Sequence, residues 1–296
     1  MRHNDLDAFL AVARAGSFRL AARELGVTGS AISQTVRALE EELEVRLFNR
    51  TTRSVVLTEA GDMLAKRLTP ALADIRSGLE EVRSLGGQPR GRVRVNVPAP
   101  ALDWIIAPRM VAFLELYPEI TLEIIEDAMD VDIVAEGFDA GVRLGLAMAQ
   151  DMIAVPIGPE QDYAVVAAPA FAERFGLPET PQDLTRFECI RHRFPSGTIF
   201  PWRFVSDGKE MTMVPQGRLT VNRADHAVTG ALGGAGLARV ALPYAEQHLA
   251  EGRLVRVLAE HAPRLPAWHL YYPSRKHMPP ALRAFIDFFV RGKPAA

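Results

Sequence analysis

The chain has 296 residues, of which 48% are apolar and 24% charged, and its formal net charge is −2. This composition is typical of a globular protein, and the length is sufficient for two or three domains. It excludes a membrane-spanning helix, because no apolar run approaches the roughly 20 residues needed. The first residues lack the apolar region of a signal peptide, and the single cysteine, Cys189, excludes an internal disulfide. We therefore expect a cytoplasmic protein that does not contact a membrane.

Three short helices are predicted at the start of the chain. The first has the i, i+3, i+4, i+7 spacing of one buried face, at Leu6, Phe9, Leu10 and Ala13. Ser17 caps a second helix that closes at Gly26. Thr28 caps a third helix that runs to about Glu44. The apolar residues of this third helix fall on a single stripe, at Ile32, Val36, Leu39 and Leu43.

The opposite face of the third helix is polar and has mostly short side chains. It carries Ser30, Ala31, Ser33, Gln34 and Arg37. In the major groove of DNA, glutamine can read adenine and arginine can read guanine. This face therefore predicts contact with DNA.

A basic hairpin is predicted next, from two strands at 45–48 and 54–57. The connection 49–53 places Arg50 and Arg53 at its tip, which suits insertion into a minor groove. The residues alone leave a second interpretation open, in which the helices form a small bundle and both arginines are solvated.

The stretch GSFRLAARELGVTGSAISQTVRALEEELEVRLFNRTTRSVVLTEAG closely resembles the N-terminal domain of bacterial-type LysR transcriptional regulators. This resemblance implies a winged helix-turn-helix that binds double-stranded promoter DNA. With the caps and the hairpin included, the candidate DNA-binding residues are Ser17, Thr28, Ser30, Ala31, Ser33, Gln34, Arg37, Arg50, Thr51 and Arg53. Gly29 departs from the family, many of whose members have a DNA-contacting glutamine there, so that contact is not expected here.

Bulk charge does not by itself indicate DNA binding. Residues 1–58 hold eight arginines against seven aspartates and glutamates. The glutamates between Glu40 and Glu44 lie at the far end of the third helix, whereas basic residues lie near its start and on the hairpin. The prediction therefore depends on where the charges are placed.

A long helix is predicted from Thr58, its cap, to about Leu85, with Pro70 as a point of bending. Apolar residues follow the 4-3 spacing of a coiled-coil seam, at Leu68, Leu72, Ile75, Leu79 and Val82. We expect this seam to pair two subunits, as the family resemblance also implies; the alternative is that it packs on its own chain. Residues 86–91 are then predicted to form a hinge between the domains.

From Arg92 onward the pattern alternates between strands and helices, which predicts an α/β domain with mainly parallel sheets. The predicted strands are 93–97, 121–125, 140–144, 163–168, 189–192, 202–205, 211–214, 217–221 and 268–272. The predicted helices are 105–117, 132–137, 169–175, 224–233, 242–251 and 280–291. The segments VAEGFDAGVRLG, GLARVALPYAEQHLAEGRLVRVL and HLYYPSRKHMPPALRAFIDF resemble the LysR effector-binding domain, in its CrgA-like branch. That resemblance implies a periplasmic-binding-protein-like fold of two subdomains.

We therefore expect a multidomain chain. It comprises a mainly α winged helix-turn-helix over 1–58, a linker helix and hinge over 59–91, and an α/β effector-binding domain over 92–296. Subdomain I would consist of about 92–161 and 267–296, and subdomain II of about 162–266.

An effector is expected between the two subdomains, at strand ends and helix starts, where backbone N–H groups can hold an anion. The candidate residues are Pro98, Ala99, Pro100, Ala101, Ala128, Leu146, Asn222, Arg223 and Ala224. Arg223 is the only fixed positive charge among them, so a carboxylate-bearing effector is one hypothesis and a solvated Arg223 is the other. The loop at 98–101 has no hydroxyl, whereas many family members grip an acid there.

Other chemistry is not indicated by the sequence. There is no GxSxG, HExxH or P-loop motif, and 233–236 follows a helix rather than a strand, the reverse of a dinucleotide-binding loop. The histidines are not spaced as metal ligands. Cys189 is predicted to be a small buried residue, and redox sensing is the alternative role.

The function predicted is a DNA-binding transcriptional regulator without cofactor, metal or enzymatic activity. Its expected partners are promoter DNA, a small-molecule effector, further copies of itself as a dimer or tetramer, and RNA polymerase. The alternatives are a small-molecule-binding protein or an enzyme on the same α/β scaffold.

Overall fold

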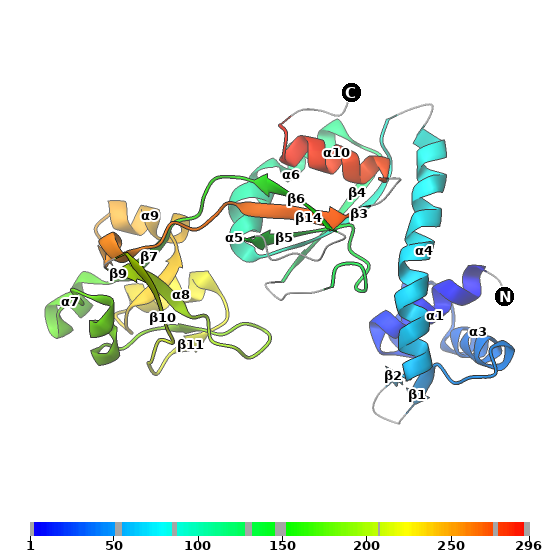
Figure 1. Ribbon diagram of the computed structural model, residues 1–296, viewed down its shortest axis with the longest axis horizontal. Helices are drawn as coiled ribbons and strands as arrows, with labels where there is room; N and C mark the ends of the chain where they lie inside the picture. The colour runs from blue at the N-terminus through cyan, green and yellow to red at the C-terminus, as the bar shows by residue number, and fades with distance from the viewer. Residues whose placement is uncertain are drawn as a thin grey trace.

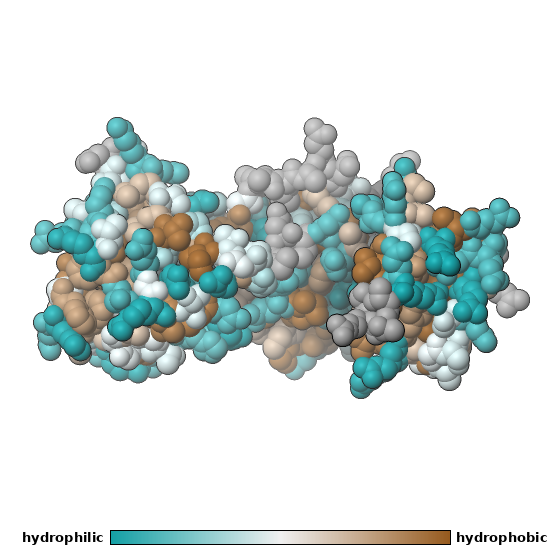
Figure 2. Space-filling view, turned by 90° about the horizontal axis from the view of Figure 1, so that it is seen from below, coloured by the Kyte–Doolittle hydropathy of each residue, from teal (hydrophilic) through white to brown (hydrophobic). Residues whose placement is uncertain are grey.

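A computed structural model describes residues 3–50, 55–84, 88–127, 132–145, 152–206, 208–274 and 278–292. The N-terminal helices and hairpin lie beside the long helix α4 at one end, a five-stranded sheet lies in the middle, and a second α/β body lies at the other end (Figure 1). Apolar residues at the surface form separate areas among polar ones along the face seen in Figure 2.

The N-terminal domain contains three helices and a two-stranded hairpin: α1 (His3–Ala15), α2 (Phe18–Glu24), α3 (Gly29–Glu42), β1 (Phe48–Arg50) and β2 (Val55–Leu57). The two strands pair antiparallel. The three predicted helices are confirmed, and their apolar faces meet in one core around Phe9, Val12, Ile32 and Val36. The first strand begins three residues later than predicted, because a turn with Glu44 in a left-handed conformation (φ 54°) follows α3.

Helix α4 (Glu59–Ser84) is confirmed together with its predicted cap. The Thr58 hydroxyl accepts a hydrogen bond from the Gly61 N–H at 3.0 Å. The first half of α4 packs on the N-terminal core through Leu64 and Leu68, and the helix also contacts α10.

Subdomain I is built on a five-stranded sheet in the order β4-β3-β5-β14-β6. The strands are β3 (Gly91–Val97), β4 (Ile120–Glu126), β5 (Ala140–Leu144), β6 (Met152–Ile157) and β14 (Trp268–Pro273). β3 runs parallel to β4 and β5, whereas β14 runs antiparallel to β5 and β6. The core beside this sheet includes Phe113 and Phe285, from α6 (Ala107–Leu116) and α10 (Pro280–Phe289).

Three predictions for subdomain I need correction. The helix expected at 105–117 is preceded by a short helical turn, α5 (Ala99–Ala101), and a π-helical segment, η1 (Leu102–Ile106), before α6 begins. The helix expected at 132–137 is a series of turns: Asp132 Oδ1 accepts from the N–H groups of Val134 and Ala135 as it would at a helix start, but Gly137 adopts a left-handed conformation (φ 69°) and ends the segment after one turn. Strand β6 was not predicted.

Subdomain II has a three-stranded sheet in the order β12-β7-β13, and every pairing in it is antiparallel. The prediction of mainly parallel sheets is therefore wrong for this subdomain. The sheet strands are β7 (Tyr163–Ala167), β12 (Ala238–Ala241) and β13 (Val255–Val257). The outlying strands are β8 (Arg191–His192), β9 (Trp202–Ser206), β10 (Lys209–Met213) and β11 (Thr220–Val221). The helices are α7 (Pro169–Phe175), α8 (Ala224–Leu232), α9 (Pro243–Ala250) and the 3-10 helices η2 (Pro181–Arg186) and η3 (Ala259–His261).

Two strands of this subdomain are shorter than predicted. Only Arg191–His192 and Thr220–Val221 pair with each other, in parallel. Cys189, expected within the first of them, instead forms an isolated bridge with Leu237. The chain passes between the subdomains twice, and the two crossings pair through reciprocal backbone hydrogen bonds between Gln161 and Leu265 of 3.0 and 3.2 Å.

Candidate nucleic-acid interface and effector cleft

The polar face of α3 is presented to solvent by a helix whose opposite face is fully buried. Ile32, Val36 and Leu39 are at most 2% exposed, whereas Gln34 and Arg37 are exposed. Thr28 caps the helix by accepting from the Ala31 N–H at 3.2 Å, and its hydroxyl lies 3.1 Å from that of Ser30. Ser17 caps α2 in the same way through the Leu20 N–H. Both predicted caps are thus present, and they fix the two helices of the helix-turn-helix.

Arg50 does not project from the hairpin as predicted. Its guanidinium donates to the Ser33 hydroxyl at 3.2 Å and to Glu40 Oε2 at 3.1 Å, and it lies 4.4 Å from the centre of the Phe18 ring. The other Glu40 oxygen accepts from the N–H groups of Leu47 and Phe48 at 2.8 and 3.2 Å. Glu40 and Arg50 therefore join α2, α3 and the first hairpin strand. This arrangement was not predicted from the sequence.

The other predicted hairpin residues, Thr51 and Arg53, lie outside the described residues. Between the end of α3 and β1 there is an open groove of about 750 Å³. Glutamates and arginines both line it, so its charge is mixed rather than uniformly positive. Its lining residues are Arg37, Glu40, Glu41, Glu44, Val45, Arg46, Phe48, Asn49 and Arg50.

The predicted effector residues lie on both subdomains. Pro98 precedes α5, which consists of Ala99, Pro100 and Ala101, the last fully buried. Asn222 and Arg223 lead into α8, which begins at Ala224. Ala128 and Leu146 lie outside the described residues.

The two subdomains contact each other through side chains that were not among the residues predicted from the sequence. The Tyr244 hydroxyl, at the start of α9, donates to Asp103 Oδ2 in the π-helical segment. The Tyr244 ring also meets Trp104 edge-on, with 5.8 Å between ring centres. Arg223 Nη1 lies 3.8 Å from Glu126 Oε1 at the end of β4. Tyr244 follows Pro243 at a predicted helix start, so the expectation that helix starts face the cleft could have identified it.

The charge of Arg223 is already compensated within the protein. Its Nε donates to Asp225 Oδ1 at 3.0 Å, and Glu126 lies on its other side. The hydrogen bond with Asp225 is the main reason that the pKa of Arg223 is raised and that the pKa of Asp225 is lowered. Burial, followed by the bond to Asp103, raises the pKa of Tyr244. In the described part of the chain, these contacts bring three carboxylates, from Asp103, Glu126 and Asp225, beside the guanidinium of Arg223.

The predicted seam of α4 divides into two parts. Leu68 packs on the N-terminal core and Leu72 is 3% exposed within its own chain. Ile75, Leu79 and Val82 are 51%, 53% and 66% exposed. The second half of the helix thus presents an uncovered apolar stripe.

Cys189 is buried, and burial raises the pKa of its thiol to about 12. A thiol of this kind is a weak nucleophile at neutral pH. Within the described ranges, no group of three His, Cys, Asp or Glu side chains is placed to hold a metal ion. No helix in the same part of the chain is long and apolar enough to cross a membrane.

Two family models match the chain, one for each end. Residues 3–62 match the bacterial regulatory helix-turn-helix of the LysR family, and residues 86–293 match the LysR substrate-binding domain. The chain belongs to the LysR family of transcriptional regulators. Members of this family combine a DNA-binding domain with an effector-binding domain.

Similar proteins cover the whole length of the chain. An uncharacterised HTH-type transcriptional regulator of Escherichia coli, YcaN, is 40% identical over 99% of this chain and 96% of its own. The E. coli regulator PgrR is 41% identical over 96% of this chain and 95% of its own. The full-length virulence activator AphB of Vibrio cholerae superposes with a TM-score of 0.66 at 27% identity over 100% of both chains. CrgA of Neisseria meningitidis superposes with a TM-score of 0.60 at 26% identity over 99% of both chains.

Proposed function

We propose that α3 of this LysR-family regulator reads promoter DNA through Ser30, Gln34 and Arg37, and that an effector bound between the subdomains changes how the DNA is held. The observation that supports the first part is the exposed polar face of a helix that is capped at Thr28 and buried on its other side. Such a face can enter the major groove, which is wide enough for a helix.

The experiment is DNase footprinting on the DNA that flanks the gene of this protein, with purified wild type and Gln34→Ala. Wild type should protect a specific site with two half-sites. Gln34→Ala should remain folded and lose preference at particular base pairs. Protection that is equal at every sequence in both proteins would contradict sequence-specific reading by α3.

For the effector, the carboxylates around Arg223 favour a cationic or neutral ligand over the carboxylate predicted from the sequence. A carboxylate bound to the free side of Arg223 would lie close to Asp225 and Glu126, which already surround that guanidinium, and would be repelled by both. A ligand with an amino group would instead meet Asp103, Glu126 and Asp225, which outnumber the single guanidinium. We therefore propose that cationic or neutral hydrogen-bonding effectors are favoured over carboxylates at this place. Calorimetric titration with amines and with carboxylates of matched size, against wild type and Arg223→Ala, tests this. Tight binding of a carboxylate that is lost in Arg223→Ala would restore the carboxylate hypothesis.

The finer statements about partners are also proposals. Exposed Ile75, Leu79 and Val82 support pairing of two α4 helices, and pairing of dimers would give a tetramer. A regulator works where the promoter and RNA polymerase are, which supports a cytoplasmic location and contact with the polymerase. The proposal that the protein is not an enzyme is supported by its relatives, which are transcriptional regulators. Turnover of a small molecule by the purified protein would overturn it.

A further inference from the structure

Strands of subdomain II end together at one edge, and that edge faces subdomain I. β8 and β11 are parallel, and the isolated parallel bridge that precedes β8 and β12 shows that β12 runs in the same direction. β7 is antiparallel to β12, so its first residue, Tyr163, lies at the edge where β12 ends. Tyr163 follows the crossing at Gln161, and Arg223, just after β11, pairs with Glu126 of subdomain I. Ligands of α/β proteins lie where parallel strands end.

An aromatic cluster lies at this edge, and all its members are partly exposed: Tyr163, His192, Phe194 and Phe200. The centre of the Phe200 ring is 5.6 Å from that of Phe194 and 6.0 Å from that of Tyr163. The His192 ring, at the end of β8, is 6.1 Å from that of Phe200 and bonds to the backbone carbonyl of Asn222. Burial lowers the pKa of His192, so its ring is uncharged at neutral pH.

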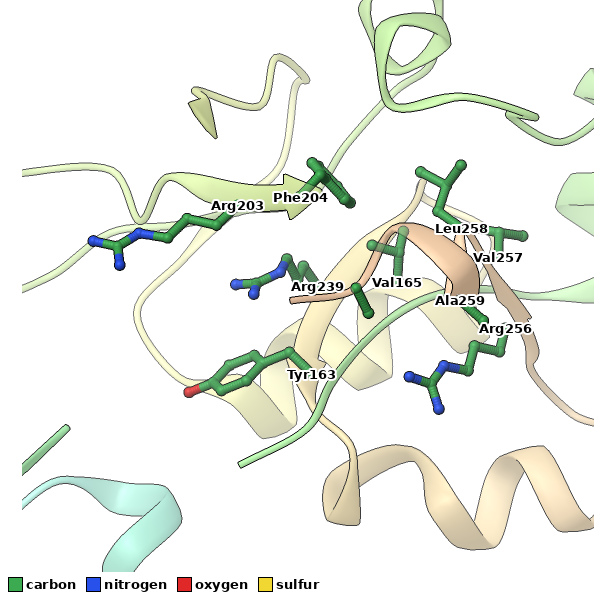
Figure 3. A pocket seen from close by; sticks show the side chains of 10 residues that line it. Tyr163, Val165, Arg203, Phe204, Arg239, Arg256, Val257, Leu258 and Ala259 are labelled. Carbon is green, nitrogen blue, oxygen red and sulfur yellow. The ribbon is translucent and has the colours of Figure 1, made fainter. Parts of the chain in front are cut away.

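Arg239 fixes two of these rings from the buried side. It is only 6% exposed, and its guanidinium carbon lies 4.6 Å from the centre of the Tyr163 ring and 5.4 Å from that of Phe200. Figure 3 shows the side chains of Arg239 and Tyr163 extending side by side in the same direction. The cavity next to them has a volume of about 10 Å³, which is room for about one water. A larger ligand would therefore lie on the partly exposed side of the rings, which the cation–π contacts hold in place.

Subdomain I contributes uncharged residues and one further ring. The segment 98–101, which follows β3, has no charged or hydroxyl side chain. Trp104, on the π-helical segment that comes next, is 49% exposed and contacts the Tyr244 ring. The carboxylates of Asp103 and Glu126 lie at the contacts with subdomain II, and carboxylates accept hydrogen bonds. A ligand at the strand ends would therefore meet aromatic rings and, at its rim, hydrogen-bond acceptors.

We propose that the effector is a planar aromatic compound whose polar group donates a hydrogen bond, and that it stacks on Phe194 and Phe200 with Trp104 on its other side. This inference rests on the proposed function, in which an effector binds between the subdomains, and it names the chemical class of that effector. Ring contacts add to the free energy of burying apolar surface, so an aromatic ring is preferred over a saturated ring of the same size. Phenols and aromatic amines belong to this class. Aromatic carboxylates do not, because Asp103 and Glu126 would repel them.

Calorimetric titration of the full chain with 4-ethylphenol and with 4-ethylcyclohexanol isolates the contribution of the ring. Both compounds carry one hydroxyl and are uncharged at neutral pH, so they differ in aromaticity alone. 4-Ethylphenol should bind about tenfold more tightly, since each aromatic contact contributes a factor of about two to ten. Equal affinities, or tighter binding of the saturated alcohol, would overturn the aromatic class.

Variants assign the preference to this site. Phe194→Leu should weaken binding of 4-ethylphenol by about fivefold and leave binding of 4-ethylcyclohexanol unchanged, whereas Phe194→Tyr keeps a ring and should keep the preference. Should Phe194→Leu fail to fold, Trp104→Leu serves instead, because Trp104 is half exposed. The control is Phe175→Leu, whose ring is 53% exposed on α7 and packs against Phe171. A lower melting temperature in Phe194→Leu with an unchanged ratio of the two affinities would show that the ring only supports the fold, and would overturn stacking.

DNase footprints with each compound separate this inference from the proposed function. 4-Ethylphenol should change the footprint of wild type and have a weaker effect on Phe194→Leu. If a saturated amine or a carboxylate of matched size binds tightly and changes the footprint while 4-ethylphenol does not, the aromatic class is wrong and control by an effector stands. If 4-ethylphenol binds in a way that depends on Phe194 but the footprint stays the same, the binding site stands and its regulatory role is wrong.

Discussion

At the scale of single residues, Arg50 changes the interpretation of the hairpin. A basic residue at a predicted hairpin tip suggested contact with a minor groove. In the structure its guanidinium instead contacts Ser33, Glu40 and the ring of Phe18. A planar guanidinium can make such stacked and forked contacts at once, whereas an ammonium cannot. We infer that Arg50 positions α3 relative to the hairpin rather than binding a phosphate.

This inference predicts how Arg50→Ala will behave. Loss of one ion pair and one cation–π contact should lower the free energy of unfolding by about 1–2 kcal/mol. DNA affinity should fall while the slope of log affinity against log salt stays unchanged. If Arg50 bound a phosphate, the slope would fall by about one per site and subunit. Arg50→Lys is the matched variant: because it keeps the charge but loses the fork, it should resemble the alanine variant in stability. Fluorescence anisotropy over a salt series and thermal unfolding provide both readouts.

Gln34→Ala is expected to act on specificity alone. The side chain is exposed on α3, so stability should change by less than about 0.5 kcal/mol. A lost base contact should cost about 1–3 kcal/mol of discrimination at particular base pairs. Selection sequencing of bound DNA measures the change, with Glu41→Ala at the end of the same helix as control. A binding-site profile identical to that of wild type would exclude Gln34 from base reading.

The caps of α2 and α3 could be predicted because a cap depends on local sequence only. Ser17 and Thr28 both accept the expected backbone hydrogen bonds. The bond from Tyr244 to Asp103 could not be predicted in this way, since the two residues are 141 positions apart. For the same reason, Glu40 appeared only as one of several glutamates at the far end of the third helix, although its two oxygens join α3 to the hairpin.

At the scale of elements, periodicity identified the helices better than it identified sheet direction. The stripes of α1 and α3 depend on residues within one helix and, apart from the exposed Leu43, they face the N-terminal core; the stripe of α4 does so only in its first half, and its role as a seam stays a prediction. Strand direction depends on partners far along the chain, so the antiparallel sheet of subdomain II was not foreseen. The helix predicted at 132–137 failed for a local reason, because Gly137 adopts a left-handed conformation that ends the segment after one turn.

Helix α4 gives the prediction at this scale. Leu72 is buried within its own chain, so a charge there would unfold the monomer rather than separate two subunits. Ile75 and Leu79 are half exposed, and a double change of both to aspartate should weaken the dimer without unfolding the N-terminal domain. The cost should be about 2 kcal/mol or more per dimer, since each charge would face an apolar partner. Sedimentation velocity measures the oligomer across a concentration series.

Met63→Asp is the control, because Met63 is 65% exposed on the same helix but lies off the seam. It should leave the oligomer unchanged. An oligomer of wild-type strength in the Ile75, Leu79 double variant would show that the exposed part of the stripe does not pair subunits.

At the scale of the whole molecule, the two subdomains are connected by two crossing segments and by the contacts around Tyr244. The two crossings pair through the backbone hydrogen bonds of Gln161 and Leu265, and we expect the subdomains to exchange between this arrangement and a more open one by rotation about this point. Among the described residues, the Tyr244–Asp103 bond, the Trp104 contact and the Arg223–Glu126 pair join the two subdomains in the present arrangement. An effector can shift this equilibrium only through its different affinity for the two arrangements.

Tyr244→Phe tests this view because it removes one hydroxyl and keeps the ring against Trp104. A hydrogen bond to a charged group contributes about 1.5–3 kcal/mol, and partial exposure reduces that value. We therefore expect roughly a fivefold shift toward the open arrangement, visible as a larger radius of gyration in small-angle scattering. Tyr272→Phe, within the core of subdomain I, should leave scattering unchanged. DNA affinity should change by a graded amount in Tyr244→Phe, since allosteric coupling of this kind is typically 1–3 kcal/mol. An altered scattering curve with unaltered DNA binding would separate cleft opening from DNA recognition, and an unaltered curve would show that the hydroxyl does not hold the subdomains together.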